Sequence, residues 1–250
     1  MPLSAFAWGT RAHRIVAHIT TFYLSSLAQQ EVAELINSQS LASIADDADL
    51  WRKTRPETSP WHYVNIPFEA SNYAPRRDCP DDNCVIAAIA KYQVILADPT
   101  FAKKIRREAL IFLVHLVADA HQPLHCIDKN DRGGNDIIVT FFGTPTNLHA
   151  VWDNALLFRT HLGERAYTHH LITWLASQRI ETLQRGTVID WVLEAHTLAR
   201  EHAYLLPVDR NLRSRYYSTN LPLLEGQIAK AGVRLARILN EAFQPDNTPP

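Results

Sequence analysis

Residues 110–125 read Leu-Ile-Phe-Leu-Val-His-Leu-Val-Ala-Asp-Ala-His-Gln-Pro-Leu-His. This apolar stretch predicts a long buried helix over about 103–121, which must end before Pro123. His115 and Asp119 are four residues apart and therefore share one face of that helix. Burying an imidazole and a carboxylate is costly unless they pair with each other or ligate a metal. The stretch thus predicts a central helix that carries either a structural His–Asp hydrogen bond or part of a metal site.

Helical patterns continue on both sides of this segment. Helices are expected over about 8–22, 26–36, 85–96, 149–160, 164–183, 187–204 and 221–243. A polar connection runs from about 46 to 82, and residues 137–142 form the one convincing strand, which a turn at 143–145 extends into a small hairpin. We therefore expect an all-α fold, with a single mostly helical domain over residues 8–244, one small β-hairpin and a frayed tail over 245–250.

The charge balance and the histidine content narrow the class of function. Lysine and arginine number 25 against 26 acidic residues, for a net charge of −1. This argues against a protein that grips duplex DNA by neutralising many phosphates, but it allows a nucleic-acid enzyme whose positive charge comes from bound metal. The 12 histidines supply the commonest metal-binding side chain. No apolar run approaches the ~20 residues that span a bilayer, so no membrane partner is expected.

The first residues bear on the cellular compartment. Ala5-Phe6-Ala7 has the small-x-small pattern that signal peptidase cuts after, which would leave Trp8 as the first mature residue. A complete signal peptide needs ~15–30 residues, so residues 1–7 are interpreted as a remnant of one. A secreted or periplasmic location is expected.

The three cysteines also bear on the cellular compartment. Cys79 and Cys84 bracket a short polar turn that a disulfide could close in an oxidising compartment, although two unrelated thiols fit the spacing equally well. Cys126 is expected to be a buried or shielded thiol.

Further His and Asp residues strengthen the metal hypothesis. His149 and Asp153 repeat the spacing of four at the start of an expected helix, and imidazole with carboxylate favours zinc or a similar divalent ion. Additional candidates lie upstream; they are Asp46, Asp47 and Asp49 with Arg52, then His62 in Trp-His-Tyr, and His13 near the N-terminus. For any one of these aspartates alone, solvation or helix capping is the simpler interpretation, and His13 alone would be incidental.

Other kinds of catalytic motif are missing from the sequence. It contains no nucleophile elbow, P-loop, Gly-x-Gly-x-x-Gly turn or Cys/His zinc finger. Gly133-Gly134-Asn135-Asp136 is interpreted as a tight turn before the strand, which could border a site.

Taken together, these segments resemble the S-one/P-one or mung-bean family of single-strand-specific zinc nucleases from fungi and plants. The motifs occur in the family's order from Trp8 to about Asp153. They are Trp-Gly…His at 8–13, Ala-Asp-x-x-Arg at 48–52, Trp-His-Tyr at 61–63, Cys-x4-Cys-Val at 79–85, His-x3-Asp…His-Gln-Pro-Leu-His at 115–125, Gly-Gly-Asn-Asp at 133–136 and Leu-His-x-Val-Trp-Asp at 148–153. Because the Cys-x4-Cys-Val motif belongs to this series, the resemblance implies the Cys79–Cys84 disulfide.

The resemblance implies a site of three zinc ions. The first ion would be bound by Asp49, His62, His115 and Asp119; the second by His125, His149 and Asp153; the third by His13, Asp119 and the main-chain amine and carbonyl of Trp8. Asp49, Arg52 and Asp119 would be the catalytic residues, with Arg52 stabilising charge on the phosphoryl oxygens. Asn65 stands where the family has an aspartate that contacts the base, so the base preference cannot be carried over.

The resemblance also implies the reaction. Single-stranded DNA and RNA would be hydrolysed to 5′-nucleotides, with removal of 3′-phosphates from nucleotides as an added activity, by a monomer without an obligate protein partner. Zinc suits this chemistry because it lowers the pKa of bound water from ~15.7 to about 7. Two alternatives remain: a phospholipase C on the same scaffold, and a non-catalytic zinc-binding protein.

Overall fold

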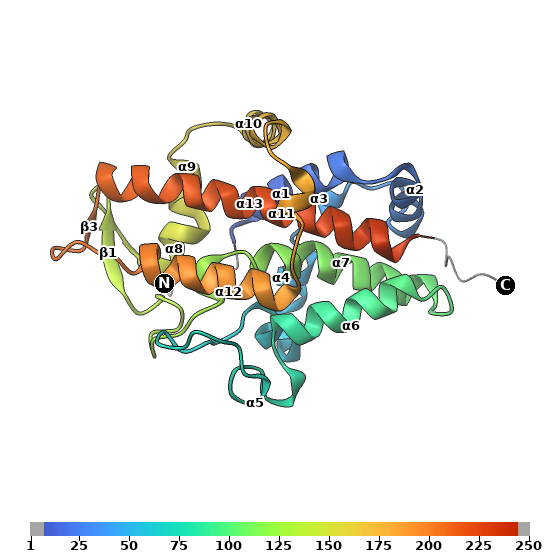
Figure 1. The fold of residues 1–250 in the computed structure, drawn as a ribbon, viewed down its shortest axis with the longest axis horizontal. Coiled ribbons are helices and arrows are strands. Elements are labelled where there is room, and N and C mark those ends of the chain that lie inside the picture. The colour runs from blue at the N-terminus through green and yellow to red at the C-terminus, as the bar shows by residue number, and fades with distance from the viewer. Residues whose placement is uncertain (1–7, 245–250) are drawn as a thin grey trace.

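The computed structural model describes residues 8–244, so the expectations for residues 1–7 and 245–250 lie outside it. Helices dominate the fold (Figure 1). The α-helices are α1 Thr10–Tyr23, α2 Ser26–Leu35, α3 Leu41–Ile44, α4 Asp47–Trp51, α5 Pro75–Asp78, α6 Val85–Ala97, α7 Lys103–Asp119, α8 Leu148–Ala150, α9 Leu156–Phe158, α10 Glu164–Ala176, α11 Ile180–Leu183, α12 Val188–Leu198 and α13 Ser214–Ala242. Three 3₁₀ turns (η1 Pro56–His62, η2 Pro80–Asp82, η3 Pro123–His125) and two π-helical segments (η4 Val151–Ala155, η5 Ala199–Ala203) complete the helical part. The expected mostly helical class is confirmed.

Helix α7 forms the centre of the core. Every residue from Ala109 to Asp119 is buried. The helix packs against α6 on one side and against α1 and α13 on the other (Figure 1). It ends at Asp119, two residues before the expected end, because Pro123 opens the 3₁₀ turn η3. The core helix therefore carries His115 and Asp119 in an interior that offers no bulk water.

The crossing of α1 and α13 requires a glycine. A Cβ atom on Gly232 would lie 2.4 Å from Cγ2 of Ile19, so a larger residue would push the helices apart. The hydroxyl of Thr20 donates a hydrogen bond to the Gly232 carbonyl at 3.1 Å. This close approach fixes α1, the helix that carries His13, against α13.

Helix α13 begins seven residues earlier than the sequence pattern indicates. The expected start at about 221 follows from Pro222, which disfavours a helix interior. The structure extends the helix back to Ser214 because Tyr216 is buried there, where its hydroxyl accepts a hydrogen bond from Trp152 and donates one to the carbonyl of Ala203. Tertiary contacts thus override the local proline signal.

The expected hairpin is confirmed and acquires a third strand. Strands β1 (Ile138–Phe141) and β2 (Thr144–Asn147) pair antiparallel through Phe142 and Gly143, whose φ angles of 48° and 85° are those of a type I′ turn. Strand β3 (Asn211–Leu212) pairs parallel with β1 and was not expected, since two residues carry no readable pattern. The sheet lies at the left end of the molecule in Figure 1.

Several expected boundaries were wrong in detail. The polar connection at 46–82 contains the short helices α4, η1 and α5, and the expected helices at 149–160 and 187–204 contain the π-helical segments η4 and η5. Elements of three to seven residues nucleate poorly by themselves, so tertiary contacts rather than periodicity decide them.

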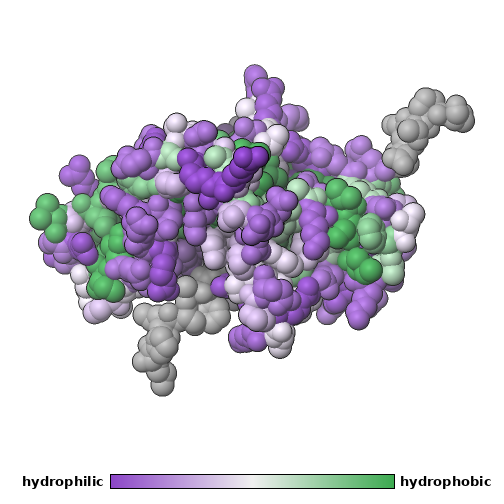
Figure 2. Space-filling model, turned by 90° about the horizontal axis from the view of Figure 1, so that it is seen from below, coloured by the Kyte–Doolittle hydropathy of each residue, from purple (hydrophilic) through white to green (hydrophobic). Residues whose placement is uncertain are grey.

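The surface is mostly hydrophilic on the face shown in Figure 2, with apolar side chains gathered toward both ends of the molecule. Across residues 8–244, none of the helices combines the length and the hydropathy of a membrane span. The Cys79–Cys84 disulfide is present with an S–S distance of 2.06 Å, and Cys126 is buried with a free thiol whose pKa burial raises.

Candidate metal centre

Four imidazoles surround the buried carboxylate of Asp119 at the end of α7. One oxygen, Oδ1, lies 3.3 Å from Nε2 of His13 and 3.3 Å from Nδ1 of His125. The other, Oδ2, lies 2.9 Å from Nδ1 of His62 and 3.2 Å from Nε2 of His115. The Asp119 side chain has no solvent exposure. Segments more than a hundred residues apart thus converge on one anionic group.

The electrostatics of this group call for a positive charge. Burial alone would raise the pKa of Asp119, but His115 and His125 hold it well below its usual range. For His115, burial by itself would lower the pKa. The Asp119 carboxylate outweighs this effect, and the pKa of His115 is raised to about 9. In contrast, burial dominates at His62 and lowers its pKa to about 4. Without metal, the buried carboxylate therefore needs a proton on an imidazole, and a cation can take that proton's place.

Asp49 joins the same group from α4. Its Oδ1 lies 3.2 Å from Nη1 of Arg52, 3.7 Å from Nε2 of His115 and 3.8 Å from Nδ1 of His62. Among residues 8–244, neither Asp46 nor Asp47 forms such an ion pair with a histidine. The geometry therefore favours Asp49, which the motif had indicated.

A second cluster forms beside the first. Oδ2 of Asp153 lies 3.2 Å from Nε2 of His149, and its Oδ1 lies 3.7 Å from Nε2 of His125. The two imidazoles are stacked with their centroids 5.1 Å apart. Gln122 donates a hydrogen bond to Oδ1 of Asp153 at 2.6 Å, a role that sequence reasoning missed although Gln122 lies within the His-Gln-Pro-Leu-His motif. Asp153 belongs to η4, and π-helical insertions are frequent at functional sites.

Backbone carbonyls orient three of the imidazoles. The Nδ1–H groups of His115, His125 and His149 donate to the carbonyls of Ala45, His62 and Gly133 at 2.7, 3.0 and 2.8 Å. Each bond fixes the tautomer and leaves Nε2 free to act as a ligand. The sequence could not predict these carbonyl partners, because every residue has a backbone carbonyl.

Gly133 explains why the glycine turn borders the site. Its φ is +60°, and a Cβ atom there would lie 2.3 Å from the carbonyl oxygen of Leu124. Only glycine fits, and the turn then presents the carbonyl that holds His149. The interpretation of this segment as a tight turn beside a site is supported by the structure.

The donor atoms fit divalent metal ions. Three sets of side chains have ligand atoms within 4.8 Å of one another; they are His13, His115 and Asp119; Asp49, His62 and His115; and His125, His149 and Asp153. Nε2 of His115, which faces the carboxylates of Asp49 and Asp119, is buried without a well-formed hydrogen bond. Such atoms are costly unless something binds them, and imidazole with carboxylate is a donor set that suits zinc.

Trp8, the proposed main-chain ligand, is the first residue of the described chain. Its side chain is buried, and the N–H of the next residue, Gly9, donates to the carbonyl of Asp153 at 3.2 Å. This hydrogen bond holds the main chain next to Trp8 close to Asp153, a member of the second cluster.

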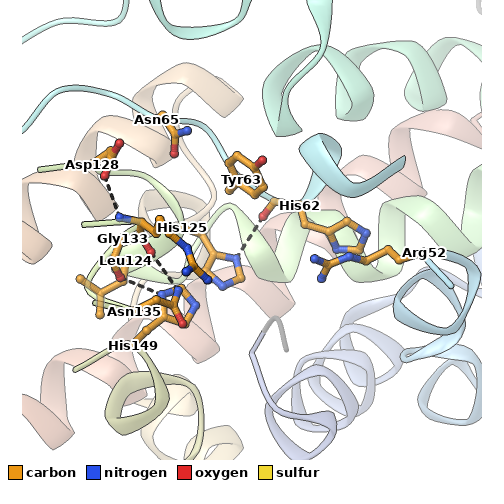
Figure 3. Close-up of a pocket in the computed structure, with 11 residues that line it drawn as sticks. Arg52, His62, Tyr63, Asn65, Leu124, His125, Asp128, Gly133, Asn135 and His149 are labelled. Carbon is orange, nitrogen blue, oxygen red and sulfur yellow. Dashed lines mark hydrogen bonds between the residues drawn. The ribbon is translucent and has the colours of Figure 1, made fainter. Parts of the chain in front are cut away.

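A hollow of about 260 Å³ opens over the clusters (Figure 3). Arg52, His62, His125 and His149 line it; in Figure 3, Tyr63 and Asn65 lie along the upper edge and Arg52 lies at the right beside His62. The sequence had indicated Arg52 and Asn65 for substrate contact, and Asn135 only as part of a turn that could border a site; it had assigned no role to Tyr63, Asp128 and Arg132, which also line the hollow. The missed residues lie in loops, where periodicity gives no signal.

Comparison with known proteins identifies relatives along the whole described chain. The family model described as S1/P1 Nuclease matches residues 8–244. The chain is 32% identical to nuclease P1 of Penicillium citrinum, over 94% of this chain and 97% of that protein. It is 31% identical to nuclease S1 of Aspergillus oryzae, over 94% of this chain and 91% of that protein. It is 31% identical to endonuclease 4 of Arabidopsis thaliana, over 96% of this chain and 90% of that protein.

Proposed function

The chain belongs to the S1/P1 nuclease family, and from that premise we propose that residues 8–244 form a phosphodiesterase with three zinc ions that hydrolyses single-stranded DNA and RNA to 5′-nucleotides. Removal of 3′-phosphates from nucleotides is proposed as a second activity of the same site. The observation that carries the proposal is the buried Asp119 carboxylate with four imidazoles around it, beside a second His₂Asp cluster and beneath an open hollow.

The proposed ligands divide among three ions. Asp49, His62, His115 and Asp119 hold the first; His125, His149 and Asp153 hold the second; and His13, Asp119 and the main chain of Trp8 hold the third. The grouping of the ligand atoms into three sets, each within 4.8 Å, supports this division. Bound zinc supplies an activated water at neutral pH and Lewis-acid stabilisation of the leaving oxygen.

Side chains that line the hollow would bind the phosphate and the base of the substrate. Arg52 places a guanidinium beside Asp49, where it can donate to the phosphoryl oxygens of a bound phosphodiester. Asn65 presents an amide that can both donate and accept, whereas an aspartate only accepts. A base bound here would therefore contact an amide that can donate as well as accept, whereas relatives with the aspartate offer an acceptor alone.

The reaction itself has a direct test. Purified protein with zinc should release acid-soluble nucleotides from heat-denatured DNA, and more slowly from intact duplex, because bases must splay out to reach the hollow. The same protein should not release phosphocholine from lecithin. Release of phosphocholine would favour the phospholipase C alternative, and bound zinc without turnover of either substrate would favour a zinc-binding protein.

Substitution of Arg52 should separate catalysis from metal binding. Arg52→Ala is expected to lower kcat by about 10²–10³-fold, since it removes a donor to developing charge, while the zinc content stays unchanged. The exposed neighbour Lys53→Ala serves as the matched control and should keep full activity. Steady-state kinetics with metal analysis would check this, and zinc loss in Arg52→Ala would mean that Arg52 has been misassigned.

A secreted or periplasmic location for a monomer is proposed alongside this function. The Cys79–Cys84 disulfide supports the location, because such bonds persist in oxidising compartments. Residues 1–7 would then be removed with the signal peptide.

A further inference from the structure

A second hollow, of about 630 Å³, includes Asp49 in its lining. We call it the Arg11 hollow. Its walls come from the start of α1, from η4 and α9, and from the loop that leads into α10; they comprise Gly9, Thr10, Arg11, Arg14, Asn154, Phe158, Leu162, Gly163 and Glu164, with Asp49. Asp49 lines this hollow while its partner Arg52 lines the first, and their side chains are 3.2 Å apart. The metal clusters therefore lie at the boundary between two openings.

The charges in the Arg11 hollow favour an anion. Glu164 forms an ion pair with Arg14 at 2.9 Å, and its other oxygen lies 2.8 Å from Nε2 of His18. Arg11, in contrast, forms no ion pair with any carboxylate among residues 8–244, and its Nη2 is buried without a hydrogen-bond partner. A guanidinium left in this state gains most from a ligand that supplies acceptor oxygens, such as a phosphate.

The hollow also offers an apolar face. The Phe158 side chain is 55% exposed and Leu162 is 40% exposed. The Arg11 guanidinium lies 5.5 Å from the centroid of the Phe158 ring, which keeps the cation beside the aromatic surface. An exposed ring next to an arginine is the combination that binds a nucleobase and its phosphate in single strands.

We propose that the Arg11 hollow binds the stretch of a single strand beyond the scissile phosphate, opposite the nucleotide held in the first hollow. Phe158 provides the surface for a base and Arg11 binds a backbone phosphate. The inference rests on the proposed nuclease function and concerns the protein that begins at Trp8. It makes strand length, rather than the scissile bond alone, a determinant of substrate affinity.

The test compares a thymidine dinucleotide with a thymidine decamer as substrates, in protein preparations whose N-terminus is identical. Arg11→Gln is expected to raise KM for the decamer by about 5- to 10-fold and to leave kcat, and the KM of the dinucleotide, within about twofold. The salt dependence of log kcat/KM for the decamer should become shallower by about 0.7, the slope expected for one lost phosphate contact in a single strand. Arg11→Lys, which keeps the charge, should restore most of the affinity.

Controls make the outcomes decisive. Arg179→Gln removes an exposed arginine that lines neither hollow and should change nothing. Phe158→Ala changes an exposed side chain, so it should fold normally and raise the decamer KM in the same way. Unchanged decamer KM in both Arg11→Gln and Phe158→Ala, or an equal change for both substrates, would overturn the inference. A wild-type protein that cleaves neither substrate would instead overturn the proposed function.

Discussion

Asp119→Asn should abolish activity and remove zinc together. Asparagine has nearly the same shape, but it is neutral and offers one oxygen in place of two, whereas the structure sets both oxygens of Asp119 against imidazoles. If the residue bridges two ions as proposed, single-strand hydrolysis should fall by about 10⁴-fold or more, a barrier increase of roughly 5.5 kcal/mol. Zinc per protein, measured by elemental analysis, should drop by at least one ion.

The control for this variant is another buried aspartate. Asp78 is buried and paired with Arg77, away from the clusters. Asp78→Asn should keep its zinc and its turnover even where it costs stability. A full zinc complement in Asp119→Asn, with activity within tenfold of wild type, would contradict the bridging assignment.

Protein that begins at Trp8 should bind three zinc ions, and protein that retains Met1 to Ala7 should bind about two. The proposed third ion uses the free α-amine of Trp8, whose ordinary pKa of ~7.7–8.0 lets a neighbouring metal ion deprotonate it. An amide nitrogen within the chain has no comparable lone pair. The longer form should therefore be slower, by about 10²-fold if the third ion stabilises charge as other such groups do.

Two observations support Trp8 as the first residue of the active enzyme. The family match begins at residue 8, and the Gly9–Asp153 hydrogen bond holds the adjoining main chain beside the second cluster. Mass spectrometry with zinc analysis of both forms would check the prediction, and proteolytic removal of residues 1–7 from the longer form should restore the third ion. A fully active protein with three zinc ions and an intact Met1 would refute it.

Local spacing explains what could be predicted about the site. His115 and Asp119, like His149 and Asp153, are four residues apart, and helical geometry alone then brings their side chains together. The hairpin turn spans two residues and is also local. The Cys79–Cys84 bridge spans five positions, but the spacing left it open and the family motif decided it. The central buried helix followed from composition, because eleven consecutive buried residues leave a clear apolar run.

The sequence by itself determined the mostly helical class, the main helices, the hairpin and the two His–Asp pairs, since each depends on residues within a few positions of one another. The family resemblance had already grouped His13 and His62 with Asp119. Only the tertiary structure showed that His125 also meets Asp119, and that the carbonyl of Ala45, 70 residues away in the chain, orients His115. It also decided where α13 begins and that Arg11 faces a second hollow. Periodicity reports only which face of an element is apolar, whereas these contacts depend on how the packed helices α1, α7 and α13 place distant segments in a shared interior.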